Sequence, residues 1–367
     1  MTFAEKLARI PGYQAGVPTG QAPEAIASGG IAQLASNESP FGPHPKVVEA
    51  IRAAAGAMNR YPDPSNSALR RRISERYGFP LGGVATGNGS CEILLAAAEA
   101  MLEPGAEIVY AWPSFSMYPH LAAMTGARAV TVPLDSQERH DLEAMAREVT
   151  VATRIVLLCS PNNPTATALA VEDVDAFVDS LPPHVLVILD EAYVEFQTLQ
   201  DPDASLALLD RHRNLVILRT FSKVYGLCGL RAGYALGPED FRLAVDRVRQ
   251  PFSVNALAQA AAAEAILHQD EVASRVERTV TERLWLEEAL RGRALSASDS
   301  QANFAWIDLG DHDEEEIVDA LARRGVIVRA GAALGGSGHM RVTYGTRSEN
   351  ERFLLALDEA LGARAGS

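Results

Sequence analysis

The sequence predicts an α/β protein in which helices cover a mainly parallel sheet, followed by a smaller α+β domain. Short apolar runs rich in Val, Ile and Leu recur between residues 107 and 220 without polar alternation, as is typical of strands covered on both faces. Helical stretches lie between these runs, which is the pattern of βαβ units. After Pro251 the pattern changes to long helices followed by strand-like segments. Because 367 residues exceed one compact core, we expect a large domain over 46–254 and a small domain made of 1–45 and 255–367.

The elements of the large domain follow in order. Helical spacing predicts helices over residues 46–57, 67–77 and 90–102. The second of these begins after Pro64-Ser65-Asn66, and the third lies between Gly87-Asn88-Gly89 and Pro104-Gly105. Strands are expected at EIVYA from residue 107, AVTVPL from 129, RIVLLCS from 154, VLVILDEAY from 185 and LVILRT from 215.

The C-terminal part has a different composition of elements. Two long helices are expected over residues 257–267 and 272–291. Three strand-like segments follow, NFAWIDL from residue 303, VIVRA from 326 and MRVTY from 340, and a last helix is expected over 348–361. Helices and strands that are segregated in this way are typical of an α+β domain.

Composition and charge exclude several classes of partner. The formal net charge of −14 disfavours nucleic acid and anionic membranes, because both would repel the chain. No apolar run approaches the roughly 20 residues that span a bilayer, and the first residues, MTFAEKLARIPGY, lack the apolar core of a signal peptide. Three scattered cysteines are too few for a disulfide framework or a zinc site. A reduced, cytoplasmic enzyme is therefore expected.

The segment RTFSKVYGLCGLRAG, residues 219–233, contains the first chemical signal. Lys223 comes directly after a predicted strand, beside Thr220 and Ser222, and Arg231 follows eight residues later. A lysine in a desolvated or cation-rich setting is a good imine former. Hydroxyl groups and an arginine suit a phosphate, since Arg binds it with two hydrogen bonds. Taken alone, Lys223 is more simply a loop lysine; the whole segment indicates a phosphate-bearing ligand.

The segment LDEAYVEF, residues 189–196, contains the second signal. Asp190 ends a buried strand and needs a partner to remain ionised, and Tyr193 can reach the same pocket. A strand followed by Asp-Glu is equally typical of metal sites and nucleotidases. None of the eight histidines is spaced from a carboxylate as a metal ligand would be, so no metal is expected.

Three further segments are weak alone. CSPNNPT (159–165) is typical of a turn. SFSMYPH (114–120) contains Phe115, whose flat ring could stack on a ligand, although a lone aromatic residue after a strand is more often part of a core. GNGSCEIL (87–94) places glycines before a helix, where free backbone N–H groups bind anions. It is neither a GxGxxG fingerprint nor a Walker loop, so nucleotide binding is not indicated.

In this order, the segments resemble the histidinol-phosphate aminotransferase family of fold-type I pyridoxal-phosphate (PLP) enzymes and its close relatives, the bacterial aromatic amino acid aminotransferases. The resemblance extends over nearly the whole chain, from LASNESPFGPHP and NRYPDPSNSALR through the segments above to QANFAW, VIVRAG and MRVTYGT. It implies transamination of histidinol phosphate with 2-oxoglutarate, giving imidazole acetol phosphate and glutamate in histidine biosynthesis. The alternative it leaves open is transamination of phenylalanine and tyrosine.

The resemblance also implies roles around the cofactor ring. Lys223 carries PLP as a Schiff base and then moves the proton between Cα and C4′. Asp190 pairs with the pyridine N–H and keeps the ring cationic, so that it acts as an electron sink. Tyr193 and Asn163 hydrogen-bond the ring oxygen O3′, and Phe115 stacks on the ring.

The same resemblance implies which residues bind the cofactor phosphate and the substrate. The residues implied at the phosphate are Ser90, Cys91, Thr220, Ser222 and Arg231, with Tyr61 reaching the phosphate of the neighbouring subunit in a homodimer with shared sites. Arg329 and Arg341, 12 residues apart on what read as neighbouring strand ends, are expected to bind substrate anions. Tyr13 and Asn37 from the N-terminal segment would close the pocket.

Three positions differ from the family pattern. Ala166 stands where glycine is usual after NNPT, and it would strain the turn if that position needs a positive φ. Cys228 stands where alanine is usual, and Cys91 replaces a polar residue, so Cys91 would contact the phosphate through its backbone.

Other functions share parts of the pattern. A PLP lyase or decarboxylase on the same fold would use the same Lys, Asp and Arg set. A transcription factor with an aminotransferase-like domain would need an added basic DNA-binding region, for which the N-terminal segment is too short. A nucleotide-binding enzyme is disfavoured, because the sequence has no phosphate-loop signature.

Overall fold

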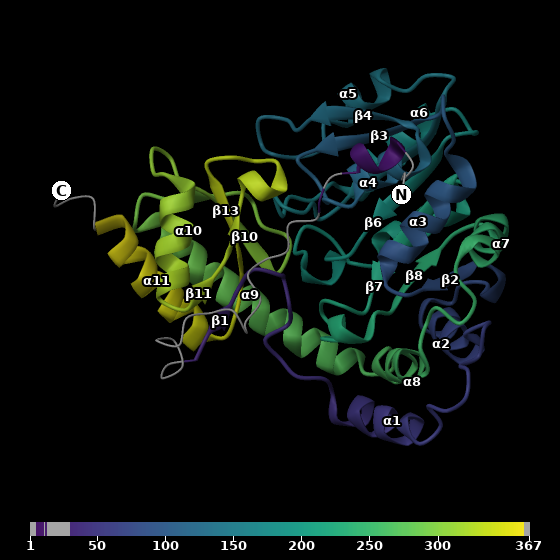
Figure 1. Ribbon diagram of the computed structural model, residues 1–367, viewed down its shortest axis with the longest axis horizontal. Coiled ribbons are helices and arrows are strands. Elements are labelled where there is room, and N and C mark those ends of the chain that lie inside the picture. Colours follow the sequence, from purple (N-terminus) through teal and green to yellow (C-terminus); the bar gives the residue numbers. More distant parts are fainter. Residues whose placement is uncertain (1–4, 11, 13–29, 363–367) are drawn as a thin grey trace.

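A computed structural model describes residues 5–10, 12 and 30–362 of the chain (Figure 1). Two sheets dominate the part it describes: a seven-stranded sheet, the large sheet, and a four-stranded sheet, the small sheet. The long helix α9 (Gln269–Arg291) runs between the two regions in Figure 1. It contacts both the small-sheet strand β10 (Phe304–Asp308) and the 3-10 helix η5 (Val194–Phe196), which follows the large-sheet strand that ends at Asp190.

The large sheet confirms the predicted mainly parallel sheet. Its order is β2-β8-β7-β6-β5-β3-β4, and only β8 runs antiparallel to its neighbours. The strands are β2 (Val84–Gly87), β3 (Glu107–Trp112), β4 (Arg128–Pro133), β5 (Thr153–Cys159), β6 (Leu186–Asp190), β7 (Leu215–Thr220) and β8 (Gly233–Leu236). The edge pair β2 and β8 was not predicted, because four-residue strands that contain glycine lack a strong β pattern.

Helices cover both faces of the large sheet, as the apolar strands predict. Alternate residues of one strand point to opposite faces. Ile108 and Ile155 therefore pack with α3 and α4, whereas Val109 and Val156 pack with α5 and α6. The helices of this region are α1 (Pro45–Ala55), α2 (Ser67–Tyr77), α3 (Ser90–Met101), α4 (Tyr118–Thr125), α5 (Leu142–Arg147), α6 (Val171–Ser180), α7 (Glu239–Val248) and α8 (Ala256–Ala265).

The small sheet is antiparallel, with the order β12-β13-β10-β9. Its strands are β9 (Ser296–Ala297), β10, β12 (Arg329–Ala330) and β13 (His339–Thr343), and α10 (Glu314–Arg323) and α11 (Arg347–Gly362) belong to the same region. The prediction of one strand over VIVRA was wrong. Its first half is β11 (Val326–Ile327), which pairs with β1 (Ala32–Gln33), and its second half is β12, which pairs with β13. A change of partner within five residues interrupts the strand.

Short 3-10 helices complete the described structure: η1 (Glu5–Ala8), η4 (Leu81–Gly83), η5, η6 (Ala204–Asp210), η7 (Cys228–Leu230) and η8 (Ala332–Leu334). Among the residues that the structure describes, no helix is both long enough and apolar enough to cross a membrane. The domain boundaries at residues 46 and 254 stay a prediction.

Candidate active site

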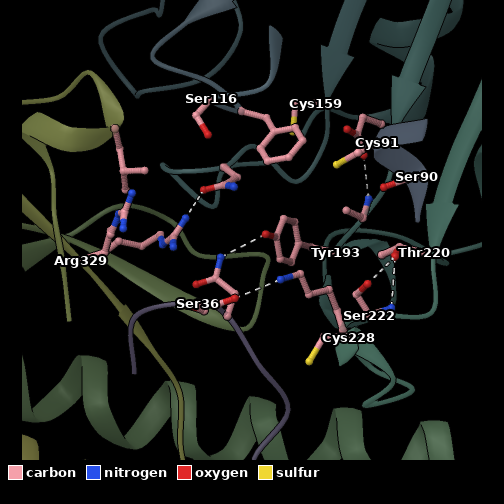
Figure 2. A pocket seen from close by; sticks show the side chains of 18 of the residues that line it. Ser36, Ser90, Cys91, Ser116, Cys159, Tyr193, Thr220, Ser222, Cys228 and Arg329 are labelled. Atoms are coloured by element: carbon pink, nitrogen blue, oxygen red, sulfur yellow. Dashed lines mark hydrogen bonds between the residues drawn. The ribbon is translucent and has the colours of Figure 1, made fainter. Parts of the chain in front are cut away.

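A pocket of about 280 Å³ lies between the large and small sheets (Figure 2). Figure 2 shows Ser90 and Cys91 on one side of it, Arg329 on the other, and Tyr193 between them. The pocket brings together most of the residues that the sequence singled out: Asn37, Ser90, Cys91, Phe115, Asn163, Asp190, Tyr193, Thr220, Ser222, Lys223, Arg231, Arg329 and Arg341. Tyr61 lies outside the pocket lining, and Tyr13 lies outside the described residues.

Parallel strands bring the central groups to one edge of the large sheet. Cys159 ends β5 and pairs in register with Asp190, which ends β6, and Thr220 ends the next strand, β7. The carboxyl ends of parallel strands meet at the same edge, which is where open α/β sheets bind ligands. The positions of these residues at strand ends in the sequence therefore explain their convergence.

Asp190 is buried and accepts hydrogen bonds from two neutral donors. Tyr118 Oη donates to Asp190 Oδ2 at 3.1 Å, and the Ala192 N–H donates to Oδ1 at 3.3 Å. Burial outweighs both donors and raises the pKa of Asp190 to about 6. The sequence did not reveal Tyr118, because a buried aromatic residue at the start of a helix carries only the signal of a core position.

Lys223 lies three residues beyond β7 and points into the pocket. Its Nζ donates to the Ser36 carbonyl at 3.1 Å and lies 5.4 Å from the centroid of the Tyr193 ring. Burial, and secondarily the charge of Arg341, lower the pKa of Lys223 to about 8. A substantial fraction of neutral amine is then present near physiological pH, which a nucleophilic lysine needs.

Two hydrogen-bonded pairs line the pocket, Asn37 with Tyr193 and Arg341 with Asn163. Asn37 Nδ2 donates to Tyr193 Oη at 3.1 Å, and burial raises the pKa of Tyr193 to about 12. Arg341 donates to Asn163 Oδ1 and, at 2.7 Å, to the Ala35 carbonyl. The phenol stays protonated, and the guanidinium is held in one orientation.

Hydroxyl groups, an arginine and a helix N-terminus form an anion cradle at the other end. Thr220 Oγ1 donates to Ser222 Oγ at 3.0 Å, and Arg231 Nη1 donates to the same oxygen at 3.4 Å. α3 begins at Ser90 after Gly89, which has no side chain to cap the first backbone N–H groups. A Cβ on Gly89 would lie 2.4 Å from Arg231 Nη2, so only glycine lets the arginine approach this helix end.

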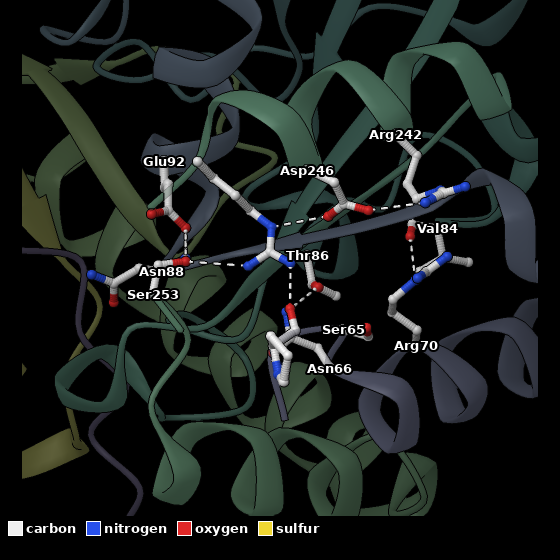
Figure 3. A network of polar contacts seen from close by, with 12 residues as sticks. Ser65, Asn66, Arg70, Val84, Thr86, Asn88, Glu92, Arg242, Asp246 and Ser253 are labelled. Atoms are coloured by element: carbon white, nitrogen blue, oxygen red, sulfur yellow. Dashed lines mark hydrogen bonds and ion pairs between the residues drawn. The ribbon is translucent and has the colours of Figure 1, made fainter. Parts of the chain in front are cut away.

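A polar network holds the loop before α3 in place (Figure 3). Glu92 Oε2 accepts from the Asn88 N–H and from Ser253 Oγ, both at 2.7 Å. Arg249 donates to Asp246 at 2.9 Å and to the Pro64 carbonyl at 2.6 Å, and its third contact, with Ser253 Oγ at 3.5 Å, connects it to Glu92. The anion cradle is therefore braced from α7 and from the segment that leads into α2.

Arg329 and Arg341 lie opposite each other on the adjacent strands β12 and β13. They are directly opposed in the β12–β13 register, with Arg341 buried and Arg329 partly exposed. The two arginines therefore lie on neighbouring strands as expected, although Arg341 is in the middle of β13 and not at its end.

Comparison with known proteins identifies the family. Residues 30–357 match the family model described as aminotransferase class I and II. The chain belongs to this aminotransferase family. This aminotransferase is 40% identical over 355 residues to an aromatic amino acid aminotransferase of Streptomyces coelicolor, with 96% of each chain covered. It is also 40% identical over 361 residues to a histidinol-phosphate aminotransferase of Geobacillus thermodenitrificans, with 98% of each covered.

Solved structures agree with the fold-type I assignment. A crystal structure of histidinol-phosphate aminotransferase from Sinorhizobium meliloti in complex with pyridoxal-5′-phosphate matches with a TM-score of 0.87 and 30% identity. The match covers 99% of this aminotransferase and 98% of that chain. The resemblance inferred from the motifs, the fold class and transamination as the type of reaction are thereby confirmed.

Pyridoxal 5′-phosphate is the cofactor of this aminotransferase, and the residues of the pocket fit it. Asp190 is a buried carboxylate whose two hydrogen-bond donors are neutral, so the protonated pyridine nitrogen would give it a charged partner. The cradle of Thr220, Ser222 and Arg231 at the α3 N-terminus suits the phosphate, and Lys223 lines the same pocket. When bound, the cofactor supplies an electron sink for the bonds at the substrate Cα.

Ala166 meets the condition under which it would be strained. Its φ is +62°, in the left-handed region, and its side chain is fully buried. Its N–H donates to the Asn162 carbonyl at 2.7 Å, so the turn beside Asn163 is closed despite the Cβ. The alanine costs roughly 1 kcal/mol relative to glycine, the usual scale for a left-handed L-residue.

Proposed function

We propose that this aminotransferase converts histidinol phosphate and 2-oxoglutarate into imidazole acetol phosphate and glutamate, a reaction of histidine biosynthesis. The observation that supports this is the opposed pair Arg329 and Arg341 in one pocket. 2-Oxoglutarate has two carboxylates, and histidinol phosphate has a phosphate but no α-carboxylate. Two guanidinium groups can bind either set of anions.

We further propose the following division of roles among the lining residues. Arg341, held by Asn163 and the Ala35 carbonyl, binds the α-carboxylate of glutamate and 2-oxoglutarate. Arg329, which is more exposed, binds the distal carboxylate or the phosphate. Asn37 closes the pocket and also orients the Tyr193 hydroxyl.

The proton chemistry is proposed for three side chains. Lys223 Nζ binds the cofactor and accepts the proton that leaves the substrate Cα, for which its lowered pKa prepares it. Asp190 holds the proton on the facing ring nitrogen, and Tyr118 orients that carboxylate. Tyr193 and Asn163 donate toward the ring oxygen, while Phe115 covers one face of the ring. Ser90, Cys91, Thr220, Ser222 and Arg231 bind the phosphate.

The substrate proposal predicts a large difference in kcat/KM. Histidinol phosphate is expected to exceed phenylalanine and tyrosine by at least about tenfold, each with 2-oxoglutarate, because a site built to pair a phosphate is left uncompensated without it. The measurement is a steady-state comparison of the three donors at one pH and salt concentration. A tenfold preference for phenylalanine would reject histidinol phosphate.

Aromatic amino acid transamination is the second candidate, and the similarity to the Streptomyces coelicolor enzyme favours it. The same arginines would bind the α-carboxylate, and the apolar wall of the pocket would bind the ring. The kcat/KM comparison decides between the two. Formation of a lyase or decarboxylase product in the same assay would reject both.

We propose that the protein is a cytoplasmic homodimer with shared sites. Tyr61 is 83% exposed and stacks on Phe252 at 4.6 Å between ring centroids, so a large aromatic surface is available to a second copy. Sedimentation equilibrium is expected to give twice the chain mass of 39.3 kDa. Tyr61→Phe is expected to raise the Kd for PLP several-fold through the lost hydroxyl; a monomer with full PLP affinity would contradict the proposal.

A further inference from the structure

One side chain differs in character from the rest of the pocket wall. Leu334 is the one aliphatic side chain larger than alanine among the described residues that line it. The two aromatic side chains among these described lining residues, Phe115 and Tyr193, are the ones proposed to contact the cofactor. Leu334 is 6% exposed and follows Arg329 on the same small-sheet segment. It is therefore placed to contact the substrate side chain close to the anion that Arg329 binds.

The loop that contains Leu334, residues 331–338, is closed by its own backbone. The Leu334 and Gly336 N–H groups both donate to the Gly331 carbonyl, at 2.8 and 2.9 Å. The Gly331 N–H donates to the His339 carbonyl at 2.8 Å. A Cβ on Gly331 would lie 2.2 Å from the Gly336 carbonyl oxygen, so the turn requires glycine there.

A carboxylate from the neighbouring helix joins both ends of the loop. Glu314, the first residue of α10, accepts from the Ala332 N–H at 2.8 Å through Oε1 and from the Gly338 N–H at 2.7 Å through Oε2. One side chain thus satisfies two loop donors that flank Leu334. Charge-assisted hydrogen bonds of this kind are stronger than neutral ones.

The tip of the loop docks on two indole rings. A Cβ on Gly335 would lie 2.6 Å from Trp112 Nε1, and one on Gly336 would lie 2.6 Å from Trp306 Cζ2. Trp112 ends β3 and leads into the segment with Phe115, while Trp306 is buried in β10 and donates to Glu138 at 2.9 Å. The loop backbone therefore contacts both sheets, and the position of Leu334 is defined relative to each.

We propose that Leu334 is a specificity-determining residue, whose side chain packs against the ring of the amino substrate. Glu314 is the positioning residue that keeps the loop, and with it Leu334, in place. This inference rests on the proposed function only in assuming a substrate with a ring, either imidazole or phenyl. Glutamate and 2-oxoglutarate are acyclic and bind through their carboxylates, so they depend much less on this wall.

The two half-reactions of transamination test the proposal within one protein. Leu334→Ala is expected to lower kcat/KM for histidinol phosphate, phenylalanine and tyrosine by about 10- to 100-fold, the usual range for a lost apolar contact in a specificity pocket. The loss with glutamate should be at least tenfold smaller. Single-turnover measurements on the PLP-loaded enzyme give each half-reaction separately. Leu355→Ala, on a residue 67% exposed in α11, is the matched control and should change neither.

Two more variants separate a specificity role from a structural one. Leu334→Phe, which fills the wall instead of emptying it, is expected to discriminate against tryptophan, the largest ring, by at least tenfold relative to phenylalanine. Glu314→Ala should raise KM for ring substrates with little change in kcat, and Glu314→Gln, which keeps one acceptor, should restore part of the loss. This KM-against-kcat split is not expected from a general loss of stability.

The outcomes are distinguishable from those of the substrate proposal. Equal losses in both half-reactions, or no loss in either, would overturn the role of Leu334. A preference for phenylalanine over histidinol phosphate would reject only the substrate proposal, because both rings depend on the same wall. If only one of the two rings loses affinity in Leu334→Ala, the shared wall is rejected.

Discussion

Lys223→Ala is expected to lower turnover by at least about 10⁴-fold, because it removes the covalent attachment and the proton acceptor together. The variant should still bind PLP noncovalently, since the cradle of Thr220, Ser222 and Arg231 does not depend on the lysine. Turnover is measured by glutamate formation, and cofactor binding by equilibrium dialysis.

The attachment itself has a chemical readout. Borohydride treatment of the PLP-loaded protein should attach a pyridoxyl group to Lys223, and mass spectrometry locates it. Lys46→Ala removes an exposed lysine outside the pocket lining and is the matched control, which should retain both label and turnover. Label on another lysine would contradict the assignment of Lys223.

Asp190→Asn is expected to lower the rate of proton removal from the substrate Cα by about 10³-fold or more. An amide is neutral and cannot stabilise a proton on the ring nitrogen as a buried carboxylate does. The variant should fold and bind PLP, and stopped-flow absorbance with a Cα-deuterated donor reports the proton step. Near-normal rates would leave Asp190 with a structural role.

The pH dependence of the cofactor-free protein checks the environment of Asp190 independently of activity. Its folded-state pKa of about 6 lies above the ordinary value of 3.8, so the protonated carboxyl favours the folded state. This stabilisation is lost as the pH rises through 6. Between pH 5 and 8 the loss in the free energy of unfolding amounts to about 1.4 kcal/mol, the equivalent of one pKa unit. In urea unfolding, the free energy of unfolding of Asp190→Asn should therefore rise by that amount relative to the wild-type protein as the pH increases from 5 to 8.

The sequence alone determined five of the seven strands of the large sheet and most of the candidate site, for a local reason. Val, Ile and Leu runs identify buried parallel strands, and β7 begins and ends at the predicted residues 215 and 220. Chemically informative residues that directly follow such strands must meet at one edge of the sheet. Asp190, Thr220 and Lys223 could therefore be assigned to one pocket before their positions were known.

Tertiary structure decided the contacts between segments that are distant in the chain. Tyr118 reaches Asp190 across 72 positions, and the Ser36 carbonyl meets Lys223 across 187. The carboxylate of Glu314 supports Leu334 only because α10 packs beside the loop. Such residues have no local pattern to distinguish them, since an aromatic or leucine side chain has the same spacing whether it fills a core or lines a pocket. Which role it takes depends on the surface that the fold brings opposite it.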